Sequence, residues 1–409
     1  MYEILKKCRS CSKEDLIETL SLGEQYLTGV FPKKIRQEIT KGPIDLVWCA
    51  NCGLLQMKQS YSLSEMYGEN YGYRSGLNAS MVTHLRNKIR MLEILAKPVE
   101  SDLVIDIGSN DATSLRAYTG SHEKVGIDPT GKKFKEFYEV GIALIPDFFS
   151  KDVFTKAFPG RKAKIITSIA MFYDLESPVD FIKDIHAVLA DEGIWHFEQS
   201  YMPSMLRTNS YDTICHEHLE FYSFEVVKGM LENCGMRVID VQMNSINGGS
   251  FAITACKAEA SYKSNRPVID WLLSQEQLMG LKTSKPYFEF AKRVAQHRDA
   301  LKSLIESLVA DRKKIFGYGA STKGNVLLQY CGFTTAHIPY IAEVNEEKFD
   351  SYTPGTNIPI ISEVEARAMN PDYFLVLPWH FKHGILEKER DYLANGGKFI
   401  FPLPEIEIV

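Results

Sequence analysis

The sequence predicts an α/β protein in three parts: a small N-terminal zinc module, a central Rossmann-like sheet, and a second, C-terminal α/β nucleotide-binding domain. Three observations carry this prediction. Two close cysteine pairs stand near the start, short apolar runs alternate with amphipathic stretches from residue 102, and a second Gly-rich turn follows residue 315. At 409 residues the chain exceeds the size at which one core keeps growing. We place the parts at residues 1–75, 76–260 and 261–409.

The composition argues against membrane and nucleic-acid partners. No apolar run approaches the roughly 20 residues that span a bilayer, and the first residues lack the apolar segment and cleavage site of a signal peptide. The net charge is -5 and no basic stripe is visible, whereas nucleic-acid binders neutralise phosphates with Lys and Arg. A cytoplasmic, monomeric enzyme acting on a small molecule is therefore expected.

The N-terminal part contains two C-x2-C pairs, Cys8 with Cys11 and Cys49 with Cys52. A tight turn between two cysteines directs both sulfurs at one ion, and two such turns complete a tetrahedral site. Zinc suits four thiolates best, although iron also accepts them. We expect one structural Zn²⁺, which stabilises a segment too small to build an adequate core alone. The other cysteines are expected to be mainly buried thiols: Cys215, Cys234, Cys256 and Cys331.

The central part has the pattern of a parallel sheet. Apolar runs predict strands at residues 103–107, 124–128, 142–145, 164–168, 194–198, 237–242 and 251–256. Apolar residues at helical spacing predict a helix over 178–189. The last two strands are joined by the tight segment 244–249, and a hairpin that ends the sheet is typical of methyltransferase domains rather than dehydrogenases.

The first strand of this sheet ends in the turn Asp106–Asp111, where a glycine lets the backbone approach a ligand. Asp128 ends the next strand, in a place where an acid can accept hydrogen bonds from a ribose. The turn lacks the G-x-G-x-x-G pattern that cradles a pyrophosphate, which favours S-adenosylmethionine over a dinucleotide. The expected cofactor contacts are Asp106, Gly108, Asn110, Asp111, Asp128, Pro129 and Ser168.

A cluster of ionisable residues, 211–220, lies between the strand at 194–198 and the hairpin. Its His-Glu-His run lacks the i, i+4 spacing of helical zinc ligands, which argues against a catalytic metal. A histidine with an adjacent carboxylate suits acid–base catalysis better, because the pKa of histidine lies near neutrality. A polar loop without chemical consequence is the other interpretation.

Residues 258–313 are predicted to be mainly helical, and a second α/β unit follows. Its turn, Gly317–Asn325, offers backbone N–H groups and a helix N-terminus that suit phosphate, with Lys323 adding positive charge. Strands are predicted at 340–344, 373–378 and 398–402.

These segments together resemble the sugar C-methyltransferases that act on nucleotide-linked 4-keto deoxysugars. The resemblance covers nearly the whole chain and rests on motifs in the same order. They are the cysteine pairs and residues 71–75, 106–111, 212–218, 247–250, 317–325, 354–359 and 377–381.

The resemblance implies a reaction and roles for particular residues. His218, beside Glu217, would remove the C3 proton next to the 4-keto group, and the enolate carbon would attack the methyl group of S-adenosylmethionine. Tyr73 would stabilise the enolate. The C-terminal domain would hold the nucleotide diphosphate. The implied substrate contacts are Tyr71, Tyr201, Asn247, Gly317, Tyr318, Gly319, Lys323, Asn325, Pro354 and Trp379.

The chain departs from the family pattern at three places. Cys215 replaces a common tyrosine, Asn247 replaces a common histidine, and Tyr173-Asp174 stands where many relatives read Ala-His. These exchanges leave O- or N-methylation of a nucleotide sugar or another small molecule as an alternative. An RNA-binding protein with a zinc module is a second alternative. A dehydrogenase that uses the Gly317 turn, with Glu343 binding ribose, is a third.

Overall fold

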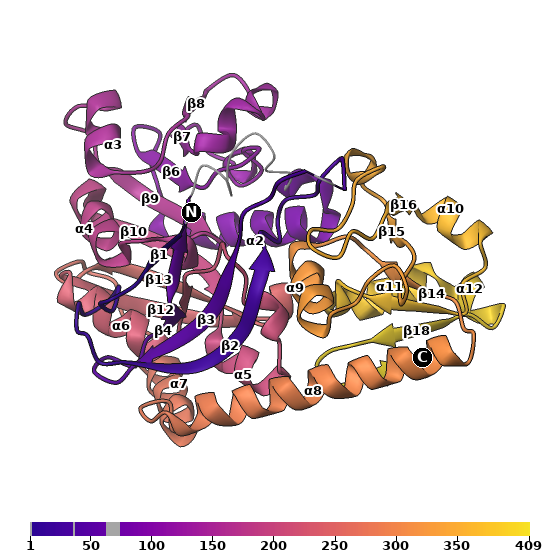
Figure 1. Ribbon diagram of the computed structural model, residues 1–409. Coiled ribbons are helices and arrows are strands. Elements are labelled where there is room, and N and C mark those ends of the chain that lie inside the picture. The colour runs from indigo at the N-terminus through magenta and orange to yellow at the C-terminus, as the bar shows by residue number, and fades with distance from the viewer. Residues whose placement is uncertain (1, 36, 63–73) are drawn as a thin grey trace.

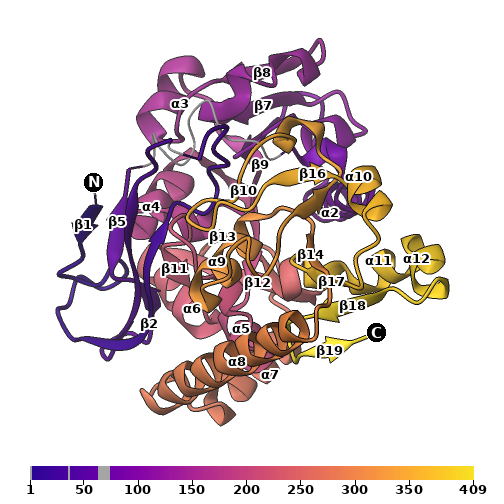
Figure 2. The same cartoon turned by 45° about the vertical axis from the view of Figure 1, so that its right-hand side comes forward.

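The computed structural model describes residues 2–35, 37–62 and 74–409. Figures 1 and 2 show the N-terminal strands β2 and β3 lying beside both the central part and the C-terminal part. The predicted α/β class is confirmed, with separate central and C-terminal sheets of seven and six strands. The expected contacts Tyr71 and Tyr73 lie outside the described residues.

The N-terminal module is an antiparallel sheet that includes one strand from the central part. Its own strands are β1 (Tyr2–Ile4), β2 (Leu16–Tyr26), β3 (Lys41–Cys49), β4 (Leu55–Met57) and β5 (Gln59–Tyr61), of which β1 and β5 form a separate pair. The short strand β11 (Glu220–Phe221) pairs with β4, placing Glu220 opposite Gln56 and Phe221 opposite Leu55. The segment that follows His218 is therefore built into the N-terminal sheet.

The central sheet has the strand order β12-β13-β10-β9-β6-β7-β8. Its strands are β6 (Leu103–Ile107), β7 (Glu123–Ile127), β8 (Ile142–Ile145), β9 (Ala163–Ile169), β10 (Leu189–Ser200), β12 (Met236–Asn244) and β13 (Ser250–Lys257). The first five are parallel, and β12 and β13 form the predicted antiparallel hairpin. All seven predicted strands are present, with ends shifted by up to five residues.

Helices cover both faces of this sheet because its strands bury side chains alternately on each side. Val104 belongs to the cluster formed with α2 (Ala79–Ala96), whereas its neighbour Ile105 packs in the cluster with α4 (Pro178–Val188). Pro178 begins α4, where its missing N–H costs nothing. The other helices of this part are α3 (Lys151–Ala157), α5 (Met202–Thr208) and α6 (Phe224–Asn233).

Helices α7 (Arg266–Leu278) and α8 (Lys285–Ala310) lead to the C-terminal sheet, whose order is β16-β15-β14-β17-β18-β19. Its strands are β14 (Ile315–Tyr318), β15 (Ile341–Glu343), β16 (Ile360–Ser362), β17 (Tyr373–Val376), β18 (Lys398–Phe401) and β19 (Glu407–Ile408). The helices between them are α9 (Thr322–Cys331), α10 (Glu363–Ala368), α11 (Lys382–Lys388) and α12 (Arg390–Ala394). In the described ranges no helix combines the length and the apolar character needed to cross a membrane.

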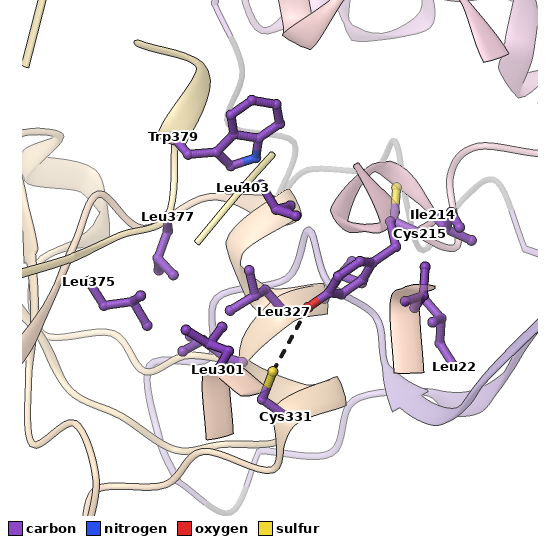
Figure 3. Packing of buried hydrophobic residues seen from close by; sticks show 14 of the residues in the cluster. Leu22, Ile214, Cys215, Leu301, Leu327, Cys331, Leu375, Leu377, Trp379 and Leu403 are labelled. Atoms are coloured by element: carbon purple, nitrogen blue, oxygen red, sulfur yellow. Dashed lines mark hydrogen bonds between the residues drawn. The ribbon is translucent and has the colours of Figure 1, made fainter. Parts of the chain in front are cut away.

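One apolar core joins the N-terminal sheet, the segment around Cys215 and the C-terminal sheet. Figure 3 shows Leu22, Cys215 and Leu375 contributing to this cluster from the three parts. The dashed line there marks the contact between Tyr211 Oη and Cys331 Sγ at 4.0 Å. Because the three parts share a core, the site between them is formed by packed elements rather than by separate domains.

Candidate active site

A cavity of about 990 Å³ lies where the three parts meet. The central sheet contributes Gly108 from the turn after β6 and Ala170 after β9. The N-terminal module contributes the loop around Gly29, and the C-terminal domain contributes Lys323 and His380. Both α/β units present the carboxyl ends of parallel strands to this space, the position at which such sheets bind ligands.

The turn after β6 has the backbone form that the sequence predicts. Gly108 and Asn110 both have positive φ, 71° and 49°, and Gly108 lines the cavity. The Asn110 amide donates to Asp128 Oδ2 at 2.7 Å, and the Thr130 amide donates to Asp128 Oδ1 at 2.6 Å. Asp128 therefore holds two neighbouring loops in place at the carboxyl ends of β6 and β7. Gly108 itself adds no side chain to this edge of the cavity, where a Cβ would lie 3.3 Å from Met171 Cγ, so its backbone can approach S-adenosylmethionine closely.

Of the other expected cofactor residues, Asp106 lines the cavity, whereas Ser168 does not. Asp106 lines the cavity, accepts a hydrogen bond from Thr167 Oγ1 at 2.6 Å, and has a pKa raised to about 7 by burial. Asp111 accepts from the Gly76 amide at 3.0 Å, which fastens the start of α2 to the turn. Pro129 begins a short 3-10 helix after Asp128.

Ser168 lies away from the cavity wall. It is fully buried, and its Oγ accepts from Trp195 Nε1 at 2.9 Å. Side chains of a strand alternate between faces, so Ser168 points into the core while its neighbour Ile169 lines the cavity. Ala170, which follows the strand and has positive φ, lines the cavity as well.

His218 is held in the tautomer that a general base requires. Its Nδ1 lies 2.7 Å from the Thr213 carbonyl oxygen, which can only accept, so Nδ1 carries the proton and Nε2 carries the lone pair. The ring lies against the Tyr173 ring, with centroids 4.5 Å apart, and lines the cavity. Burial lowers the pKa of His218 to about 4, and the Lys323 charge acts in the same direction. The imidazole is therefore neutral at pH 7.

Glu217 connects the His-Glu-His segment to the N-terminal module. It lines the cavity, and Thr28 Oγ1 donates to its Oε2 at 3.5 Å. A Cβ added at Gly29 would lie 2.5 Å from Glu217 Oε1, so a side chain there would displace the Glu217 carboxylate. Burial raises the pKa of Glu217, and Cys215 beside it is fully buried.

The C-terminal wall is formed by the start of α9 and the segment after β17. Lys323 Nζ donates to the Asn247 carbonyl at 2.9 Å, and both of these expected substrate contacts line the cavity. Burial lowers the pKa of Lys323, while the nearby Asp212 raises it. Trp379 Nε1 donates to Asp212 Oδ2 at 2.8 Å, so Trp379 orients the acid that faces Lys323.

Several predicted substrate contacts lie outside the cavity wall. Tyr201 is buried and donates to Glu276 at 2.7 Å, and Tyr318 donates to Glu389 at 2.9 Å inside the C-terminal domain. Asn325 donates to the Thr28 carbonyl at 2.7 Å, joining α9 to the N-terminal module. Gly317, Gly319 and Pro354 are likewise absent from the lining, although Pro378, next to Gly319, is part of it.

The structure adds residues that the sequence analysis missed. Glu198, at the end of β10, lines the cavity and accepts from Lys88 at 2.7 Å and from Asn244 at 2.8 Å, with His84 Nε2 at 2.6 Å. Burial opposes its ionisation, but His84 and Lys88 lower the pKa of Glu198 to about 2. Gln199 lines the same wall. The run Glu-Gln-Ser at the end of a predicted strand was the signal available in the sequence.

The predicted four-cysteine site is confirmed. Sulfur atoms of Cys8, Cys11, Cys49 and Cys52 all lie within 4.8 Å of one another. Cys8 Sγ is 3.5 Å from Cys52 Sγ, and Cys11 Sγ is 3.6 Å from Cys49 Sγ. A tetrahedron with Zn–S bonds of about 2.3 Å has edges of about 3.8 Å, so this arrangement fits one zinc ion.

Comparison with known families agrees with the three-part architecture. Residues 8–67 match a zinc binding domain, residues 83–241 match a methyltransferase domain, and residues 245–404 match a C-methyltransferase C-terminal domain. The chain is 29% identical to the C-methyltransferase NovU of Streptomyces niveus over 412 residues, which cover 99% of this chain and 97% of that protein.

Two solved methyltransferase structures resemble less than half of the chain. Magnesium protoporphyrin IX methyltransferase of Synechocystis PCC 6803 is 11% identical, with a TM-score of 0.33, over 44% of this chain and 88% of that one. The 1,6-didemethyltoxoflavin-N1-methyltransferase of Burkholderia thailandensis is 10% identical, with a TM-score of 0.33, over 43% and 78%. Similarity at this level supports no inference about the acceptor.

Proposed function

Since this chain is an S-adenosylmethionine-dependent C-methyltransferase that carries a zinc-binding domain, we propose that its acceptor is a nucleoside-diphosphate-linked 4-keto deoxysugar. The supporting observation is the set of residues that line the cavity between the three parts. Its central wall holds the turn at Gly108 and the neutral base His218, and its C-terminal wall holds Lys323 at the start of α9. The cavity thus offers a turn for the cofactor, a base for the acidic C–H bond of the sugar and a cation for the diphosphate.

The chain's own part in the reaction is to position the acceptor and to move one proton. His218 Nε2 takes the proton from C3, next to the ketone, and the electrons of that C–H bond pass into the enolate. The Nδ1–H bond to the Thr213 carbonyl stabilises the imidazolium that forms. When bound, S-adenosylmethionine supplies an electrophilic methyl group on a sulfonium sulfur. The walls of the cavity exclude water and hold the enolate carbon facing it.

The proposed function is tested with labelled S-adenosylmethionine and a panel of nucleotide-linked sugars with and without a 4-keto group. We expect label on carbon in the keto sugars only. A 4-keto group acidifies both the C3–H and the C5–H bond, so NMR of the product must locate the new methyl group. Label on oxygen or nitrogen would favour the alternative acceptors and would overturn the role of the enolate.

Replacing Lys323 by methionine is expected to raise the KM for the nucleotide sugar by about 10- to 100-fold, because a hydrogen bond to a charged group is lost. The Kd for S-adenosylhomocysteine should change by less than about 2-fold, since Lys323 belongs to α9 of the C-terminal part and Gly108 to the turn after β6 of the central sheet. Initial rates measure the KM for the nucleotide sugar, and calorimetry measures the Kd for S-adenosylhomocysteine. Lys313→Met, an exposed lysine outside the cavity wall, is the control. An unchanged KM would exclude Lys323 as a diphosphate ligand.

A further inference from the structure

The side-chain amide of Gln199 is buried in the cavity wall without a hydrogen-bond partner. Gln199 is only 1% exposed, and neither its Nε2 nor its Oε1 has a partner in the part of the chain that the structure describes. A carboxamide has two N–H donors and one acceptor oxygen, and leaving them buried and unpaired is costly. A ligand in the adjoining cavity can supply the missing partners.

Neither the neighbouring carboxylate Glu198 nor the other amides around the same cavity share this property. Glu198, the residue before Gln199, is fully engaged by His84, Lys88 and Asn244. Asn78 accepts from two backbone amides at the start of α2. Among the described amide side chains that line the cavity, only Gln199 is buried with both polar atoms unpaired. The unpaired amide is therefore a local feature of this wall.

The position of Gln199 places it beside the acceptor rather than the cofactor. Strand register aligns Ile107 of β6 with Ser168 of β9, and Ser168 with Phe197 of β10, so Gln199 lies level with the turn after β6. It is two strands away, or about 10 Å at the usual strand spacing. β7 and Asp128, where the cofactor is expected, lie on the opposite side of β6. Gln199, Tyr173 and His218 all line the large cavity, and Ser200, the residue after Gln199, also lines a small adjoining pocket with Tyr173 and His218.

We propose that Gln199 is a specificity-determining residue that binds two adjacent hydroxyl groups of the acceptor sugar. A neutral amide donates to one hydroxyl oxygen through Nε2 and accepts from the next hydroxyl at Oε1, a match that neither a carboxylate nor a phosphate provides. The inference rests on the proposed function and adds to it a selection for a diol. An acceptor lacking one hydroxyl leaves the buried amide half unpaired and is rejected.

The test compares acceptors that differ by one hydroxyl, in the wild type and in Gln199→Met, which keeps the length of the side chain. We expect the wild type to prefer the diol by about 10- to 100-fold in kcat/KM, and the variant to lose most of that preference. The Kd for S-adenosylhomocysteine should stay within 2-fold. The Tm of the variant should be unchanged or higher, because an unpaired polar group is removed.

Gln329→Met is the matched control, since both amide atoms of Gln329 bond the Tyr26 backbone, at 2.8 and 3.2 Å. This control should lower the Tm and leave the diol preference intact. If the wild type does not distinguish the diol from the acceptor lacking one hydroxyl, the inference is overturned without any variant. It is also overturned if Gln199→Met keeps the diol preference, or if Gln199→Met loses affinity for S-adenosylhomocysteine instead. If the wild type methylates no nucleotide sugar, the proposed function fails and this inference fails with it. If Gln199→Met methylates the nucleotide sugars with an unaltered diol preference, only the role of Gln199 is refuted and the proposed function stands.

Discussion

Replacing His218 by alanine is expected to lower kcat by about 10²- to 10⁴-fold, the usual contribution of a positioned general base. The Thr213 carbonyl fixes the proton on Nδ1, so Nε2 is the basic atom that this variant removes. Affinity for S-adenosylhomocysteine should persist, because the turn at Gly108 is built from β6 and Asp128. Single-turnover methyl transfer separates this chemical step from product release, and calorimetry measures cofactor binding.

His186→Ala provides the matched control, because His186 lies on α4 outside the cavity wall. It should retain the wild-type rate. A His218→Ala enzyme within about 3-fold of the wild type would transfer the role of base to another group, and Asp174 and Glu217 in the same wall would be examined next.

The pH profile gives an independent check on the same base. His218 works when neutral, and burial together with the Lys323 charge lowers its pKa to about 4. The acid limb of kcat/KM due to this group should therefore lie near pH 4, leaving the rate flat from about pH 6 to 8. An unperturbed histidine would place this limb near pH 6.5. A limb at 6.5 that is lost in His218→Ala would contradict the burial that the structure gives this ring.

Local sequence signals were sufficient for the strands of the central sheet. The run Leu103–Ile107 is entirely buried, and a strand covered on both faces reads as an unbroken apolar run, so its ends could be predicted. The strand ending at Ser200 was predicted too short, because its first half carries the exposed acids Asp191 and Glu192. The cysteine pairs predicted the metal site for an equally local reason, since their spacing is set by the ion.

The candidate site could be predicted only where a motif and a side-chain direction agree. Gly317, Tyr318 and Gly319 form a recognisable turn, yet alternation along β14 turns Tyr318 toward Glu389 and away from the cavity. Ser168 fails for the same reason. Gln199 has no motif at all, and its significance arises from missing partners, which only tertiary structure reveals.

Pairing between short strands that are distant in the sequence is a second feature that could not be predicted from the sequence. Two residues, Glu220 and Phe221, carry no strand signal of their own, yet they complete the N-terminal sheet beside β4. The Met57 amide also donates to the Leu219 carbonyl at 2.8 Å. The cysteine module and the base at His218 are thus linked through residues that follow the base directly.

Replacing Cys8 by serine should therefore abolish both zinc binding and methyl transfer. Structural zinc contributes an apparent 10–16 kcal/mol in small domains, as much as the whole stability of many proteins, so losing one ligand unfolds the module. The disordered β4 would release β11, and with it the segment that carries His218. Metal analysis should fall from one zinc per chain to well below one, Tm should fall, and activity should approach background.

Cys234→Ser is the control, because this half-buried thiol follows α6 and is not one of the four clustered cysteines. It donates only a weak bond to the Val179 carbonyl at 3.8 Å. It should keep one zinc and full activity. A Cys8→Ser protein that retains one zinc and the wild-type Tm would show that three sulfurs suffice. Iron in the purified wild type would instead replace the zinc assignment, since four thiolates also bind iron. Full zinc loss with normal catalysis would separate the module from the active site and contradict the coupling through β11.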